Sequence, residues 1–147
     1  MRSRLRTKRR TERGAAAVEF ALVVPFLIVI VMGIVNFGFI FAQQLSLSNG
    51  ARQAARYAVV DGPTCAQIRT EGQNAGATIG MDTADVPVPV VSGCTSDSTK
   101  PCAGTASGTN ITVTMTRDTT WVVPIPPFNL VTPPTLVGRG IMRCEFS

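Results

Sequence analysis

The sequence has no histidine, and this absence removes the most common route to catalysis. Histidine is the usual general base near neutral pH and a frequent metal ligand. No G-x-S-x-G, P-loop or H-E-x-x-H pattern is present either, and the acidic residues of the C-terminal part are scattered. We therefore expect no catalytic residues, no bound metal and no cofactor, and we do not expect an enzyme.

The sequence is also poor in charge, at 16% charged residues, where soluble domains have about a quarter. From Phe20 to Ala42 there is no Asp, Glu, Lys or Arg at all. A helix needs about 20 apolar residues to cross a bilayer. The uncharged segment predicts one membrane-spanning helix.

The positive charge lies almost entirely before this segment. The first 13 residues hold seven Lys or Arg residues and one acid, Glu12. The chain from Ala15 onward holds seven basic and eight acidic residues and is close to neutral. A basic tail can bind nucleic acid. We favour the alternative that it flanks a membrane helix on the cytoplasmic side, against anionic lipid, and we expect no nucleic acid partner.

Cysteine is absent from the residues before and within the apolar segment. All four cysteines follow it, and an even number of cysteines in an exported region predicts two disulfides. A zinc site would need closer C-x-x-C spacing than this chain offers. Four cysteines allow three pairings, of which we favour Cys94–Cys102 with Cys65–Cys144.

The chain divides into three parts. Residues 1–14 form a basic leader, which we expect to be disordered up to residue 13. Residues 15–60 form one helix of about 70 Å, longer than a bilayer requires, with residues 20–42 in the membrane and residues 43–60 beyond it. Pro25 should bend or loosen this helix, and Asp61-Gly62-Pro63 should end it.

Residues 61–147 predict a small extracytoplasmic domain that carries the disulfides. A helix capped by Thr64 should cover residues 65–79, although its glycines lower its helix propensity. Residues 86–91 should lie at a sheet edge or in an unpaired stretch because of two prolines, and residues 111–116 alternate as a strand does. With irregular chain at 94–110 and 121–134 and a closing strand at 136–146, the fold class is α+β. Two or three antiparallel strands should pack on the long helix.

Glu19 is an acid at the edge of the apolar segment. A carboxylate near hydrocarbon costs several kcal/mol unless it is paired. Two explanations remain open on physical grounds. Glu19 either lies at the interface near Arg13 and the lipid headgroups, or it receives a cationic partner through assembly.

The residues around Glu19 resemble a known family. Arg13-Gly14-Ala15-Ala16-Ala17-Val18-Glu19-Phe20, the later Asn36-Phe37-Gly38, and Asn49-Gly50-Ala51-Arg52-Gln53-Ala54-Ala55-Arg56-Tyr57-Ala58 are similar to the TadE/TadG-like family. The basic leader ending in glycine also resembles the signal of type IV prepilins. The resemblance covers about residues 13–60.

The resemblance implies roles for four residues. Prepilin peptidase would cut between Gly14 and Ala15, and the new amine at Ala15 would be cationic near neutral pH. Glu19, followed by the aromatic Phe20, would pair with that amine on a neighbouring subunit and so set the subunit register.

The same resemblance implies a function. The chain would be a minor pilin- or pseudopilin-like structural component of a Tad (tight adherence, Flp) pilus or a related secretion system. It would lie in the cell membrane as a single-pass protein, and its partners would be membrane lipid, prepilin peptidase, other Tad pilins and assembly platform proteins. The alternative is a signal-anchored cell-surface domain that binds a partner without processing or filament assembly.

Overall fold

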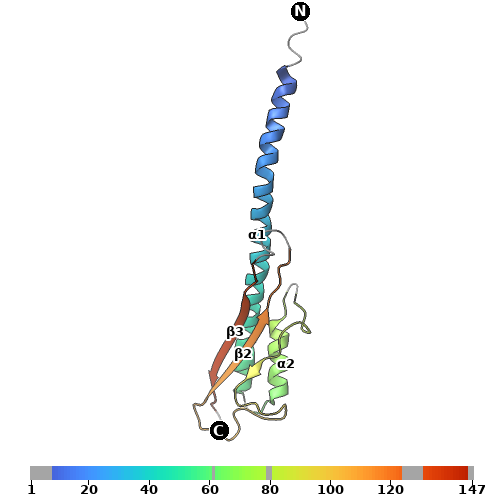
Figure 1. Ribbon diagram of the computed structural model, residues 1–147. Helices are drawn as coiled ribbons and strands as arrows, with labels where there is room; N and C mark the ends of the chain where they lie inside the picture. The colour runs from blue at the N-terminus through green and yellow to red at the C-terminus, as the bar shows by residue number, and fades with distance from the viewer. Residues whose placement is uncertain (1–7, 61, 79–80, 124–130, 146–147) are drawn as a thin grey trace, which may run out of the picture.

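The computed structural model describes residues 8–60, 62–78, 81–123 and 131–145 of the 147-residue chain. It contains two helices and one antiparallel sheet of three strands. The long first helix projects from a small α+β domain built on its C-terminal half (Figure 1). The elements are α1 (Lys8–Ala58), α2 (Cys65–Gly76), β1 (Val90–Val91), β2 (Asn110–Asp118) and β3 (Thr135–Arg143).

Helix α1 has 51 residues and continues through Pro25. At 1.5 Å per residue it is about 77 Å long. It begins at Lys8, so the expectation of disorder is wrong for residues 8–13, and residues 1–7 lie outside the described chain. Lys, Arg and Glu are good helix formers, and the helix continues through the one glycine, Gly14, between them and the apolar segment.

The two halves of α1 have different surroundings. Large apolar side chains from Val18 to Val35 are mostly exposed, whereas the C-terminal half turns a stripe of small residues and leucine into the domain. The stripe repeats at helical spacing and comprises Leu47, Ala51, Ala54, Ala55 and Ala58. This half of the helix serves as one wall of the core.

Helix α2 starts as predicted, with Thr64 as its N-cap. The Thr64 hydroxyl accepts from the Gln67 backbone N–H, and the Gln67 side chain accepts from the Thr64 N–H, which makes a capping box. The helix ends at Gly76, before the predicted residue 79, because Ala77 is already extended.

The two helices pack through glycine. A Cβ on Gly50 would lie 2.7 Å from the Gly72 carbonyl oxygen and 3.0 Å from the Gly76 Cα. Gly72 and Gly76 are buried on α2, where a Cβ at Gly72 would crowd Pro89 and Ala54 and a Cβ at Gly76 would crowd Val86. The glycines that weaken this helix in isolation therefore permit its close packing in the domain.

The sheet has the order β1-β2-β3, and both pairings are antiparallel. The expectation of an edge or unpaired segment is confirmed, because only Val90–Val91 form a strand and this strand, β1, lies at the edge of the sheet beside β2. Strand β2 alternates as predicted, with Ile111, Val113 and Met115 buried against the helices. In β3 the residues opposite Val113 and Met115 are Gly140 and Gly138, which lie directly on the α1 backbone.

The structure contains two disulfides, but their pairing differs from the one favoured above. Cys65 bonds Cys94 and Cys102 bonds Cys144, with Cα–Cα distances of 5.9 and 5.7 Å. The loop after β1 folds back over the start of α2, where the Cys65 N–H donates to the Thr99 carbonyl at 2.8 Å. This return places Cys94 beside Cys65 and leaves Cys102 near the end of β3.

Candidate assembly and membrane site

The residues that the sequence singled out for processing and assembly lie on the free N-terminal half of α1. Gly14, Ala15, Glu19 and Phe20 are all exposed, and Phe20 is 71% exposed. A Cβ placed on Gly14 would meet nothing within 4 Å. The structure therefore presents this stretch as one bare helix surface with no contact to the domain below it.

Glu19 lies one helical turn after Ala15, on the same side of α1. Its neighbours in the chain, Val18 and Phe20, are large, apolar and exposed. The structure shows no ion pair to Glu19 among the side chains that it describes, which exclude those of residues 8–13. Nothing within the described part of the chain compensates this carboxylate if its surroundings are apolar.

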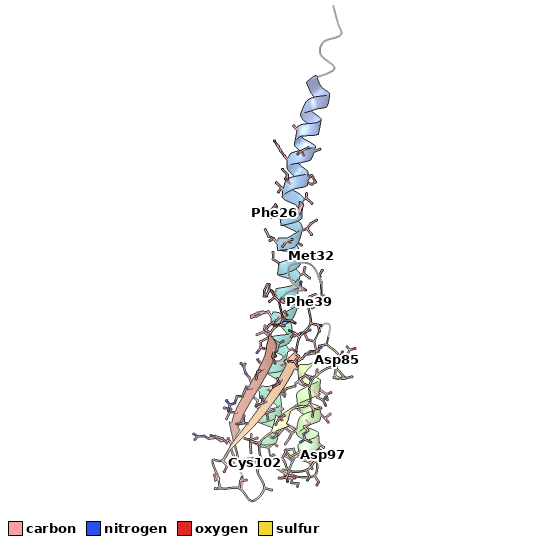
Figure 2. The ribbon with its side chains drawn as sticks, viewed as in Figure 1. Phe26, Met32, Phe39, Asp85, Asp97 and Cys102 are labelled. Carbon is pink, nitrogen blue, oxygen red and sulfur yellow. A yellow bond between two sulfur atoms is a disulfide. The ribbon has the colours of Figure 1, made fainter. Side chains whose placement is uncertain are left out.

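An apolar surface continues from Glu19 toward the domain. Among the described residues, α1 is the one helix that is long and apolar enough to cross a membrane. Its exposed side chains include Phe26, which is labelled in Figure 2, together with Leu22, Leu27, Ile30 and Ile34. A surface of this size suits lipid or other apolar helices rather than water.

A buried asparagine interrupts one side of this apolar surface, and sequence reasoning missed its role. The Asn36 side chain is 0% exposed. Its Nδ2 donates to the Val123 carbonyl at 3.2 Å, and its Oδ1 accepts from the Val123 N–H at 2.9 Å. A single polar residue within an apolar helix was the available signal, since a buried amide requires partners.

The segment that supplies Val123 follows β2 and runs along α1 toward the N-terminus of that helix (Figure 1). The Trp121 ring packs edge-to-face on Phe37 of α1, with ring centroids 6.1 Å apart. The Trp121 indole N–H donates to the Val131 carbonyl at 2.7 Å, and the Thr119 hydroxyl donates to the Pro134 carbonyl at 2.7 Å. These contacts fasten both limbs of this connection to each other and to α1.

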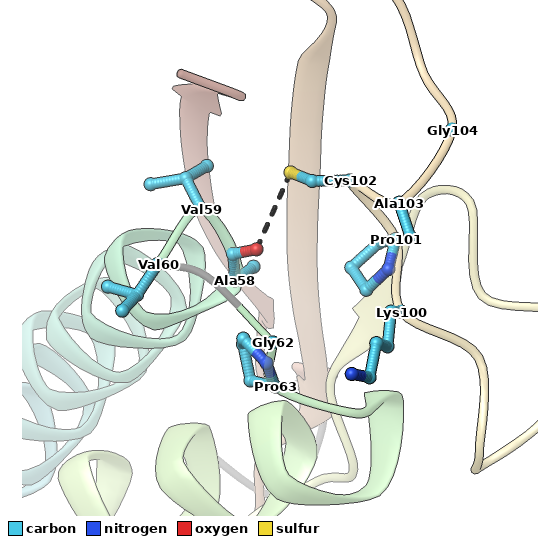
Figure 3. Close-up of a pocket in the computed structure, with 10 residues that line it drawn as sticks. All are labelled: Ala58, Val59, Val60, Gly62, Pro63, Lys100, Pro101, Cys102, Ala103 and Gly104. Atoms are coloured by element: carbon cyan, nitrogen blue, oxygen red, sulfur yellow. Dashed lines mark hydrogen bonds between the residues drawn. The ribbon is translucent and has the colours of Figure 1, made fainter. Parts of the chain in front are cut away.

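A shallow cavity lies at the opposite end of the domain (Figure 3). It has a volume of about 230 Å³ and lies between the end of α1 and the loop that carries Cys102. Lys100 is the one charged side chain among its described lining residues, and Cys102 is held in a disulfide. Ligand pockets are usually larger, with several convergent polar groups, so this cavity supports no binding function.

The described residues contain no group of three His, Cys, Asp or Glu residues placed to hold a metal ion. The remaining candidates for a functional site are Glu19 on the uncovered part of α1 and the apolar surface that follows it. Together they define a class of protein: a small α+β domain carried on one candidate membrane-spanning helix.

Within that class, the N-terminal helix is similar to one known family. Residues 14–56 match the TadE-like protein family, which confirms the resemblance found in the sequence. This family is a structural family associated with the Tad pilus, and the match indicates a Tad pilus-associated component. No curated protein and no solved structure matches the chain.

Proposed function

We propose that this protein is a minor pilin- or pseudopilin-like subunit that assembles through the N-terminal half of α1 into a Tad pilus or its assembly machinery. The observation that carries the proposal is the place of the family match. It begins at Gly14 and includes the helix surface that the protein's own domain leaves uncovered, as well as the packed part of α1 up to residue 56. Assembly through this helix requires an accessible surface of this kind.

The proposed orientation follows from charge. The basic residues before Gly14 stay in the cytoplasm, and the domain with its disulfides lies outside. In that orientation α1 spans the membrane and prepilin peptidase cuts between Gly14 and Ala15 at the cytoplasmic face. Cleavage removes seven positive charges and creates a cationic amine one turn away from Glu19.

The proposed assembly step pairs two charges that are costly in lipid. A carboxylate and an ammonium group each lose their hydration in an apolar medium, and their attraction offsets part of that cost. The amine of one subunit meets Glu19 of its neighbour, so that only one axial register satisfies both groups. The function is structural, and it needs no chemistry from the outer domain.

Processing can be tested by the mass of the mature protein. In cells with an active prepilin peptidase, we expect the membrane-extracted chain to begin at Ala15, as measured by intact-mass and N-terminal peptide spectrometry. A Gly14→Leu variant should keep its leader, because a side chain there would crowd the peptidase site. A wild-type chain that retains Arg2 would contradict processing and favour the alternative of an unprocessed surface domain.

The pairing role can be tested with Glu19→Gln. This change keeps the shape of the side chain and removes its charge, so the partner amine would be left uncompensated in lipid at a cost of about 3 kcal/mol or more. We expect incorporation into sheared pilus or assembly-complex fractions to fall at least tenfold, while the membrane level of the protein stays constant.

The matched control for this change is Glu71→Gln on α2, which alters an acid of the outer domain. This variant should assemble normally. Normal incorporation of the Glu19→Gln protein would reject the pairing, whatever the outcome of the processing experiment.

A further inference from the structure

We propose that the outer boundary of the bilayer's hydrocarbon core lies at Asn36 and Phe37, and that the segment Thr119–Val123 rests in the lipid headgroup region. The domain then sits directly on the membrane rather than on a helical stem above it. This inference rests on the proposed membrane span of α1 and fixes where that span ends.

The first support is the change of surroundings at Asn36. Before it, the large side chains of α1 are mostly exposed and apolar. At Asn36, both polar atoms of a fully buried side chain bond the backbone of Val123. From Ile40 onward, one face of α1 packs into the domain through Ile40 and Leu47, while Phe41 and Leu45 on the other faces stay exposed. The contacts between α1 and the rest of the protein therefore begin at this residue.

The second support is length. Counting about 20 residues back from Asn36 reaches Ala16, and 20 residues at 1.5 Å per residue make about 30 Å, the thickness of the hydrocarbon core. The uncharged segment on its own favoured residues 20–42. That placement would submerge the non-helical backbone around Val123, and irregular backbone exposed to lipid is strongly disfavoured.

The third support is the chemistry of the surface at this level. Phe37 and Val131 are each 57% exposed and Val122 is 50% exposed, beside the partly exposed Trp121. In water this would be an unfavourable apolar patch. Tryptophan concentrates at membrane interfaces because its ring is apolar and its N–H is polar. The bilayer interface is the surface that suits this combination.

The placement has a consequence for Glu19. If the inner boundary lies near Ala16, the Cα of Glu19 is about three residues inside the hydrocarbon core, or about 5 Å. The explanation that Glu19 merely lies among the headgroups then becomes less favourable. Glu19 then needs a cationic partner within the membrane. The position of the outer boundary at Asn36 thus supports the proposed pairing at the inner end of the span.

The test uses Trp121, which is the chain's single tryptophan. The purified full-length protein is reconstituted into phosphatidylcholine vesicles whose acyl chains carry bromine, a quencher of indole fluorescence. We expect bromine close to the glycerol backbone to quench Trp121 at least twice as strongly as bromine near the methyl ends of the chains. Emission that does not respond to bromine at either depth overturns the placement and indicates a protein partner for this patch.

Two relocated tryptophans serve as references, both in a Trp121→Phe background. Phe26→Trp lies in the middle of the proposed span and should be quenched most by bromine near the methyl ends. Tyr57→Trp lies near the far end of α1 and should not be quenched. If Phe26→Trp is quenched and Trp121 behaves like Tyr57→Trp, the span stands and the boundary at Asn36 is wrong. If Phe26→Trp is not quenched, the span fails, and with it this inference.

Discussion

Replacing Gly140 with alanine should largely unfold the outer domain. The added Cβ would collide with backbone atoms of α1, namely the Ala51 carbonyl group and the Arg52 Cα. Backbone atoms cannot rotate away as a flexible side chain can, so β3 would have to separate from the helix. We expect a loss of about 3 kcal/mol or more in the free energy of unfolding, at the upper end of overpacking effects.

The measurement is urea unfolding of the full chain in detergent, followed by Trp121 fluorescence. Gly38→Ala is the matched control because it adds the same atom to another glycine, where the Cβ meets nothing within 4 Å. That variant should be unchanged or up to about 1 kcal/mol more stable, since alanine favours helix. Equal stabilities of the two variants would show that β3 does not lie against the α1 backbone.

Removing the bond between Cys102 and Cys144 should have an effect of similar size. The cysteines are 42 residues apart in sequence. Closing a loop of that length lowers the entropy of the unfolded chain and so raises its free energy by about 4 kcal/mol at room temperature. The Cys102→Ala/Cys144→Ala double variant should be destabilised by about that amount. Urea unfolding under non-reducing conditions measures the difference from the wild type.

The pairing itself has a separate test in a variant that keeps Cys94 and Cys102. With Cys65→Ala and Cys144→Ala, the structure leaves these two cysteines without their partners, since each bonds a residue elsewhere in the fold. Both thiols should then react with maleimide in the folded protein. An oxidised Cys94–Cys102 bond in this variant would instead support the pairing that the sequence favoured.

Local patterns were sufficient for much of this fold. The alternation in β2, the capping residue Thr64 and the long apolar helix are properties of neighbouring residues, and each predicted its element. Glycine was harder to interpret. Gly50 and Gly140 lower helix or strand propensity, yet each permits two backbones to approach. That benefit depends on the opposing surface, which a single sequence does not display.

The candidate site was predicted in part for the same reason. Glu19 and Gly14 were recognisable from their place beside an apolar segment, and both lie within the family match at residues 14–56. Asn36 gained significance only when the structure brought Val123 to it from 87 residues away in sequence. The predicted disulfide pairing was wrong for a similar reason, because the pairing depends on how the loop after β1 returns over α2.

Neither disulfide cross-links α1 to the rest of the domain. They tie α2 to the loop after β1, and that loop's continuation to the end of β3, while every cysteine lies after Ala58. Tension on an anchored subunit would pass from lipid into the domain along α1. The helix would resist it through the tight seams at Gly50, Gly138 and Gly140 rather than through a cross-link. Under load, α1 would therefore slip first against the disulfide-bonded part of the domain. The packing at these glycines would set the mechanical strength of the subunit.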